Sequence, residues 1–146
     1  MLSIQISDIK DFMSHLLSKD TFDHFYFIEA SIKMGVSYQI QGRINEGFYD
    51  TSVEQTLNRE FCYWKEIRHR IFDIIKGKRL PLSCKIVLGL SKKSISYLIA
   101  HNNSSFREED IEGIYINILY DPKNLLITTG ISYKNFSLDK SLEYAF

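Results

Sequence analysis

A cluster of cationic side chains is the part of the sequence that could bind a charged ligand. It contains Lys65, Arg68, His69, Arg70, Lys76, Lys78 and Arg79. Clustered cations bind phosphate groups because binding releases condensed counterions. The candidate ligand-binding residues for an anion or a nucleic acid are therefore Arg68, Lys76, Lys78 and Arg79. The alternative is a solvated helix face, which is what most charge runs form, and we favour it here.

A second polar cluster lies near the C-terminus and contains Thr128, Thr129, Gly130, Ser132 and Lys134. Hydroxyl groups and an ammonium group on one strand could line a small pocket for an anion, or the pocket of a small enzyme. Threonine also favours strands, and an isolated glycine is compatible with a β-bulge, so a structural role is the simpler interpretation. The candidate ligand-binding residues here are Thr128, Ser132 and Lys134.

The sequence gives little support to metal or covalent chemistry. Glu66 and His69 are spaced to share one helix face, but a di-metal bundle needs two such pairs and further carboxylates. Cys62 and His69 are about 10 Å apart along a helix, which is too far for a thiol and its base. Glycine-rich phosphate loops, paired C-x-x-C motifs and H-E-x-x-H are absent from the sequence. We therefore predict no catalytic residue, no metal and no cofactor, and we favour a protein that is not an enzyme.

The bulk composition limits the class of protein. A chain of 146 residues with 45% hydrophobic and 25% charged residues fits one globular domain, residues 1–146. Eighteen cationic and eighteen anionic side chains give a formal net charge of zero, so only a local patch could bind nucleic acid. Two cysteines do not form a disulfide framework. Without a signal-peptide pattern or a membrane-spanning run, we expect a cytoplasmic protein that does not enter a membrane.

Hydrophobic periodicity predicts the elements that position these residues. Alternation predicts strands over residues 2–6, 25–33 and 36–44, the last two forming a hairpin. Apolar residues at helical spacing predict a helix that follows Ser7 as its N-cap. The same spacing from Val53 to Ile75 predicts one long central helix, from Thr51 to Ile75.

The second half of the chain repeats this mixture of strands and helices. We predict a strand at 84–90, a helix at 91–101, a polar connection at 104–113, strands at 114–120 and 125–131, and a helix that begins at Ser137. The resulting order is β-α-β-β-α-β-α-β-β-α. Because two hairpins join strands that are adjacent in sequence, the predicted fold class is α+β with a mainly antiparallel sheet.

Three stretches of the sequence carry a resemblance to a known family. They are 8–12 (DIKDF), 75–81 (IKGKRLP), and 128–130 (TTG) leading to 136–140 (FSLDK). On these stretches the chain resembles a small bacterial family that is defined as a domain of unknown function. The resemblance implies no activity and no catalytic residues.

The leading functional hypothesis is a non-catalytic binding or assembly module of the bacterial cytoplasm. Many aromatic residues accompany the weak signals for catalysis, and Tyr63 and Tyr115 fall off the predicted core faces. A homodimer formed through an exposed sheet face or edge is the expected partner state, beside an unknown protein partner. The alternatives are anion or nucleic-acid binding by the basic cluster, and a small enzyme with a pocket near the C-terminal strand.

Overall fold

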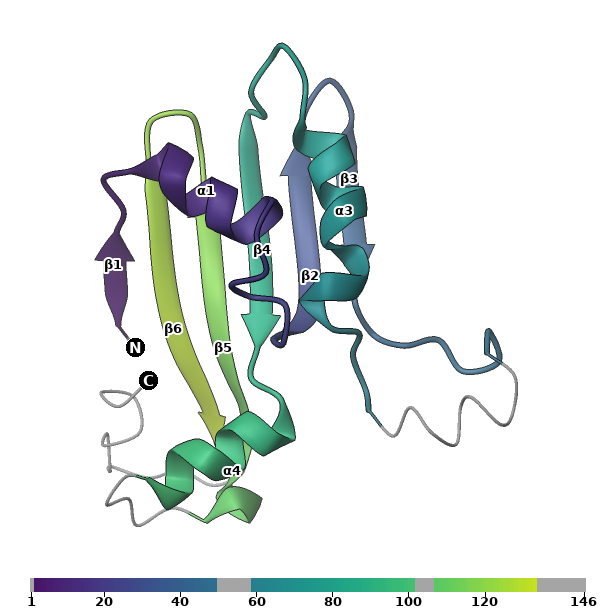
Figure 1. Ribbon diagram of the computed structural model, residues 1–146, viewed down its shortest axis with the longest axis vertical. Coiled ribbons are helices and arrows are strands. Elements are labelled where there is room, and N and C mark those ends of the chain that lie inside the picture. The colour runs from purple at the N-terminus through teal and green to yellow at the C-terminus, as the bar shows by residue number, and fades with distance from the viewer. Residues whose placement is uncertain (1, 50–58, 102–106, 134–146) are drawn as a thin grey trace.

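The protein is a six-stranded antiparallel sheet with helices on one face (Figure 1). The computed structural model describes residues 2–49, 59–101 and 107–133. The strand order across the sheet is β1-β6-β5-β4-β2-β3, and every neighbouring pair is antiparallel. The predicted α+β class with a mainly antiparallel sheet is therefore confirmed. The strands are β1 (Ser3–Gln5), β2 (Tyr26–Lys33), β3 (Ser37–Gln41), β4 (Ser83–Gly89), β5 (Ile111–Tyr120) and β6 (Leu125–Tyr133).

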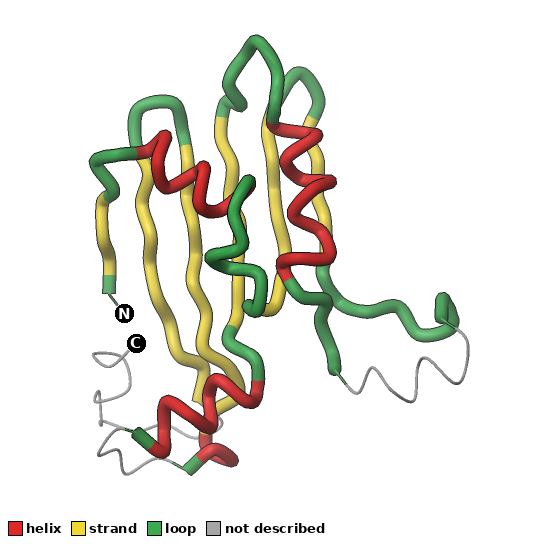
Figure 2. The backbone as a smooth tube through the Cα atoms, viewed as in Figure 1, coloured by secondary structure: helices red, strands yellow, loops and turns green. Residues whose placement is uncertain are grey.

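Three α-helices are described, together with a short 3-10 helix at Glu108–Asp110. Figure 2 shows all of them against the strands. Helix α1 begins one residue later than predicted, because the Asp8 carboxylate, and not Ser7, accepts the hydrogen bond from the Asp11 amide at 3.0 Å. None of the described helices has the length and apolar character that a membrane span requires. The α-helices are α1 (Ile9–Leu17), α3 (Trp64–Ile75) and α4 (Lys92–Ala100).

The prediction of one long helix from Thr51 to Ile75 is not confirmed. The helix begins at Trp64, and residues 59–63 are not helical. Phe61 forms a β-bridge with Arg43, and Tyr63 forms one with Tyr26. The apolar spacing through Phe61 therefore continues into a segment that pairs with the lower end of the β2–β3 hairpin. Residues 50–58 and the predicted helix from Ser137 lie outside the described residues.

Alternation along the strands separates a buried face from an open one. The buried face packs against α1 and α3, and its core includes Leu16, Trp64, Ile71, Ile86 and Ile118. Helix α4 covers the lower end of β5 and β6 through a smaller cluster around Ile95, Ile111 and Ile114. No helix of the described residues covers the opposite face of the sheet, which we call the open face.

Two tight turns set the registers that create this open face. Met34 donates its amide to the Val36 carbonyl at 3.0 Å and closes the β2–β3 hairpin. In the β5–β6 hairpin, the Asp121 carboxylate accepts the amides of Lys123 and Asn124, both at 2.8 Å. This is the local bonding that favours Asp in turns. Both hairpins predicted from the sequence are confirmed.

Candidate functional site

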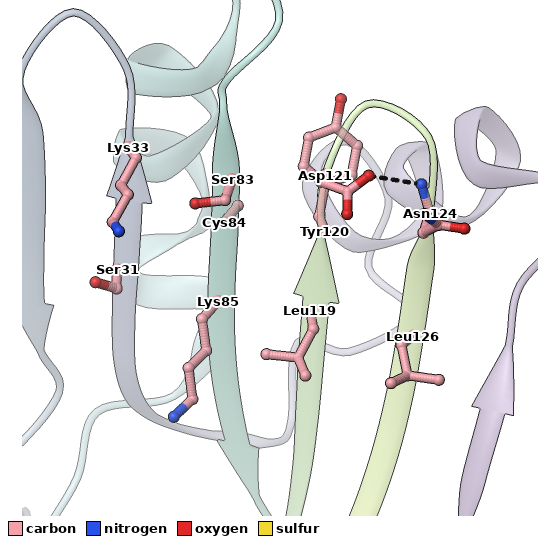
Figure 3. A pocket seen from close by; sticks show the side chains of 10 residues that line it. All are labelled: Ser31, Lys33, Ser83, Cys84, Lys85, Leu119, Tyr120, Asp121, Asn124 and Leu126. Carbon is pink, nitrogen blue, oxygen red and sulfur yellow. Dashed lines mark hydrogen bonds between the residues drawn. The ribbon is translucent and has the colours of Figure 1, made fainter.

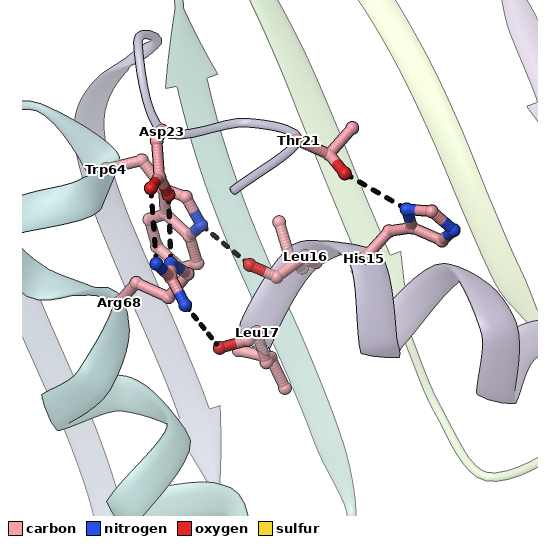
Figure 4. A network of polar contacts seen from close by, with 7 residues as sticks. All are labelled: His15, Leu16, Leu17, Thr21, Asp23, Trp64 and Arg68. Carbon is pink, nitrogen blue, oxygen red and sulfur yellow. Dashed lines mark hydrogen bonds and ion pairs between the residues drawn. The ribbon is translucent and has the colours of Figure 1, made fainter. Parts of the chain in front are cut away.

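The structure does not gather the basic cluster into one binding site. Arg68 is largely buried between α3 and the end of α1 (Figure 4). Its guanidinium donates to both carboxylate oxygens of Asp23 at 2.9 and 3.2 Å, and to the Leu17 carbonyl at 3.4 Å. Trp64 donates its indole N–H to the Leu16 carbonyl at 2.8 Å. Both side chains therefore satisfy carbonyls at the C-terminal end of α1, where an isolated helix leaves them unpaired.

The other cations of this cluster point to different surroundings. Lys76 forms an ion pair with Asp73 at 3.0 Å and lies 5.9 Å from the centre of the Phe72 ring. Lys78 and Arg79 are exposed in the loop between α3 and β4, and no carboxylate among residues 2–49, 59–101 and 107–133 pairs with them. Of the four candidate residues Arg68, Lys76, Lys78 and Arg79, only Lys78 and Arg79 lack a carboxylate partner among the described residues.

The C-terminal cluster is divided between the two faces of β6. Thr128 lies opposite Asn117 and Ser3 on the open face, whereas Thr129 accepts the Leu2 amide at 3.2 Å through its hydroxyl group. Ser132 donates its hydroxyl group to the Glu112 carboxylate at 3.0 Å, which places an anion beside it. Lys134 lies outside the described residues. The described members of the cluster thus do not form an anion pocket.

The described residues do not assemble a catalytic or metal-binding combination either. His69 is on α3, on the helical side of the sheet, whereas Thr128 is on the open face. The His101 ring stacks on Tyr97 and is hydrogen bonded to the Tyr97 carbonyl at 2.9 Å. Glu66 bonds the Arg59 guanidinium at 2.7 and 3.0 Å, and this bond lowers the pKa of its carboxyl group. Among the described residues, no three His, Cys, Asp or Glu side chains are grouped to hold a metal.

Both cysteines are free thiols, and the pKa of each is raised. Burial raises the pKa of Cys84 to about 12. Burial, with a smaller contribution from the Glu66 carboxylate, raises the pKa of Cys62 to about 11. Since the thiolate is the nucleophile, neither cysteine is activated for covalent chemistry.

The open face contains a groove above β2, β4, β5 and β6 (Figure 3). Its volume is about 430 Å³. Lys33 and Ser31 of β2 lie on one side of it, Lys85 of β4 lies in its middle, and Leu119 and Leu126 form its apolar floor on the other side. We call it the Lys33–Lys85 groove. No sequence pattern predicts this groove, because its residues come from four strands whose order cannot be read from local patterns.

A second hollow, of about 210 Å³, lies at the lower end of the open face. Tyr26 and Tyr115 contribute rings to it, and both face the same glycine, Gly89 of β4. Burial raises the pKa of each tyrosine. Glu60 and Glu112 also line this hollow, beside Arg43 and Lys92. The charges of its walls are balanced, so it shows no preference for one sign of ligand.

The outer edge of β3 is a further open surface of the part of the chain that the structure describes. β3 is the last strand in the sheet order, and no described strand pairs with its outer side. Its residues Ser37, Tyr38, Gln39 and Gln41 are exposed, and Ile40 is half-buried. None of the five is charged. Natural edge strands are normally protected by charges, proline or bulges, and these five residues have no such protection.

Comparison with known proteins assigns the family of the chain. No curated protein and no solved structure matches the sequence. The model of one family, described as a family of unknown function (DUF5721), matches residues 15–146. Since this match covers most of the chain and agrees with the resemblance noted in the sequence, the protein belongs to the DUF5721 family of unknown function.

Proposed function

We propose that this chain is a non-catalytic assembly module that forms a homodimer by pairing its β3 edge with β3 of a second copy. The observation that carries the proposal is the uncharged, exposed outer edge of β3. A free strand edge presents unpaired N–H and C=O groups that a second strand can satisfy. A second copy of the same chain suits this edge, because β3 can pair with itself in an antiparallel register.

The hydrogen bonds at the two ends of the β2–β3 ladder fix which β3 groups point outward. Met34 bonds Val36, and the Gly42 amide bonds the Ile28 carbonyl at 2.8 Å. Directly opposed residues of an antiparallel pair alternate between bonded and non-bonded pairs. Tyr38 and Ile40 therefore bond β2, and the main-chain groups of Ser37, Gln39 and Gln41 point away from the sheet.

These outward groups are self-complementary in one antiparallel register. A two-fold axis at Gln39 places Gln39 opposite its own copy and Ser37 opposite Gln41, so every outward-pointing residue lies in a bonded pair. The same register places Tyr38 opposite Ile40 on the helical side of the sheet. Tyr38 has 38% of its surface exposed in the single chain, and this pairing would cover it. Aromatic and β-branched pairs of this kind stabilise antiparallel strands by about 0.2–1 kcal/mol each.

Sedimentation equilibrium over a range of protein concentrations tests the proposal. We expect a reversible monomer–dimer equilibrium for the natural chain. Gln39→Pro removes the central outward N–H without removing a bond to β2, so it should shift the equilibrium to monomer. Gln39→Lys should do the same, because it opposes two like charges on the axis. Gln5→Lys, the same substitution on the other edge strand, is the matched control and should leave the dimer intact. A natural chain that stays monomeric up to about 1 mM would contradict the proposal.

We also propose a cellular compartment for the protein. Two free thiols support a reducing compartment, for which we propose the bacterial cytoplasm. That residues 1–146 act as one domain stays a prediction.

A further inference from the structure

We infer that the Lys33–Lys85 groove of the open face binds a small organic anion that has an apolar body. The inference concerns a different surface from the β3 edge and goes beyond the assembly function. It rests on the placement of two cations and two leucines on neighbouring strands of one face.

The strand registers bring the two lysines together. Lys33 of β2 lies opposite Ser83 of β4, and Lys85 of β4 lies opposite Ser31 of β2. The two lysines are therefore diagonal neighbours on the same face, about 7–8 Å apart at their backbones. Ser31 and Ser83 complete this arrangement with two hydroxyl groups. Ammonium and hydroxyl groups are donors, so this end of the groove is suited to an acceptor-rich anion.

The lysines are not neutralised by the protein that surrounds them. Within the part of the chain that the structure describes, neither Lys33 nor Lys85 forms an ion pair. Asp121 lines the groove, but its carboxylate already accepts the amides of Lys123 and Asn124. Glu29 lies on the same face in the adjoining hollow, with Lys85 between it and the groove. Both ammonium groups are therefore available to attract an anion.

The other half of the groove selects an apolar body. Leu119 of β5 and Leu126 of β6 are directly opposed, and Leu119 retains 37% exposure. Leu119 also lies opposite Lys85, so the apolar floor begins beside the cation. A volume of about 430 Å³ lies within the usual range for small-molecule sites. A ligand with one anionic head and a short apolar body would satisfy both halves, whereas inorganic phosphate would use only the first.

Isothermal titration with a matched set of eight-carbon probes tests the inference. We expect octanoate and octyl phosphate to bind, octylammonium not to bind, and inorganic phosphate to bind at least tenfold more weakly than octyl phosphate. The stronger of octanoate and octyl phosphate identifies the head group as carboxylate or phosphate. Backbone amide shifts in β2, β4 and β5 should locate the bound probe in this groove.

Variants separate this groove from nonspecific attraction to a cationic surface. Lys33→Gln with Lys85→Gln should weaken octyl phosphate binding at least tenfold. Lys10→Gln with Lys93→Gln removes the same charge from two exposed lysines of α1 and α4, and it should have no more than a twofold effect. Leu119→Asn should weaken octyl phosphate but not inorganic phosphate. Three results would overturn the inference. They are binding of octylammonium as tight as that of the anionic probes, an equal loss of octyl phosphate affinity in the two double-lysine variants, and no binding of either anionic probe at millimolar concentration.

Discussion

Replacing Arg68 by methionine tests whether this guanidinium stabilises the fold or serves as part of a ligand site. Methionine keeps much of the side-chain length but removes the charge and all five N–H donors. The substitution leaves Asp23 as an unpaired carboxylate, in a pair whose side chains are only 12% and 13% exposed. It also removes a donor from the Leu17 carbonyl at the end of α1.

The burial of the Arg68–Asp23 ion pair sets the size of the expected loss of stability. Breaking a buried ion pair by removing one partner costs about 3–5 kcal/mol. Since this pair retains some contact with water, we expect the lower end of that range, about 3 kcal/mol of lost unfolding free energy. With a urea dependence of about 2 kcal/mol per molar, the unfolding midpoint should fall by roughly 1.5 M. Arg70→Met, an exposed position on the same helix, is the control and should change stability by less than about 0.5 kcal/mol.

Urea denaturation followed by the fluorescence of Trp64, the single tryptophan, measures these values directly. The double variant Asp23→Asn with Arg68→Met should lose less stability than the sum of the two single variants, because it leaves no unpaired charge. If Arg68→Met resembles Arg70→Met, Arg68 does not hold α1 against α3, and its role as a ligand-binding residue becomes open again.

Two further predictions concern backbone packing and thiol reactivity. A Cβ atom on Gly42 would overlap the Phe27 carbonyl oxygen, so Gly42→Ala should strongly lower the midpoint of thermal unfolding. Gly35→Ala is the control and should leave the midpoint unchanged, because nothing lies within 4 Å of a Cβ atom there. Equal midpoints for the two variants would contradict the close approach of Gly42 to β2. The raised pKa values of Cys62 and Cys84, about 11 and 12, leave at most about 0.1% thiolate at pH 8, so iodoacetamide should alkylate both at least tenfold more slowly in the folded protein than in urea. Rapid labelling of the folded protein would show that the thiols are less buried than described.

Local patterns predicted most of the strands because each strand has one face against the core. In β2, β3 and β5, every second side chain packs on the face that α1 and α3 cover, and this gives the period-two alternation. The hairpin turns contain residues that hydrogen bond locally, as Asp121 does with the Lys123 amide. Antiparallel neighbours joined by short turns are local in sequence, so their pairing could be predicted.

Long-range pairing is what the sequence could not reveal. Phe61 continues the helical spacing of Trp64 and Ile67, yet it is held in an extended segment by the bridge to Arg43. Arg68 belongs to a charge run, but its partner Asp23 lies in the connection between α1 and β2. Lys33 and Lys85 lie far apart in the chain and meet only because β4 inserts between β2 and β5. Whether a cation is buried in an ion pair or left exposed therefore depends on residues that are distant in the sequence.

Disulfide trapping at the proposed two-fold axis tests the assembly function most directly. In the β3 register centred on Gln39, the two Gln39 residues form a bonded pair with Cα atoms about 5.5 Å apart, a separation that a disulfide can span. Gln39→Cys should therefore give a covalent dimer under mild oxidation. Ser37→Cys alone should not, because the two Ser37 positions are about 13 Å apart along the strands. Absence of a covalent Gln39→Cys dimer, or equally fast trapping through Ser37→Cys, would contradict this register and the assembly that it forms.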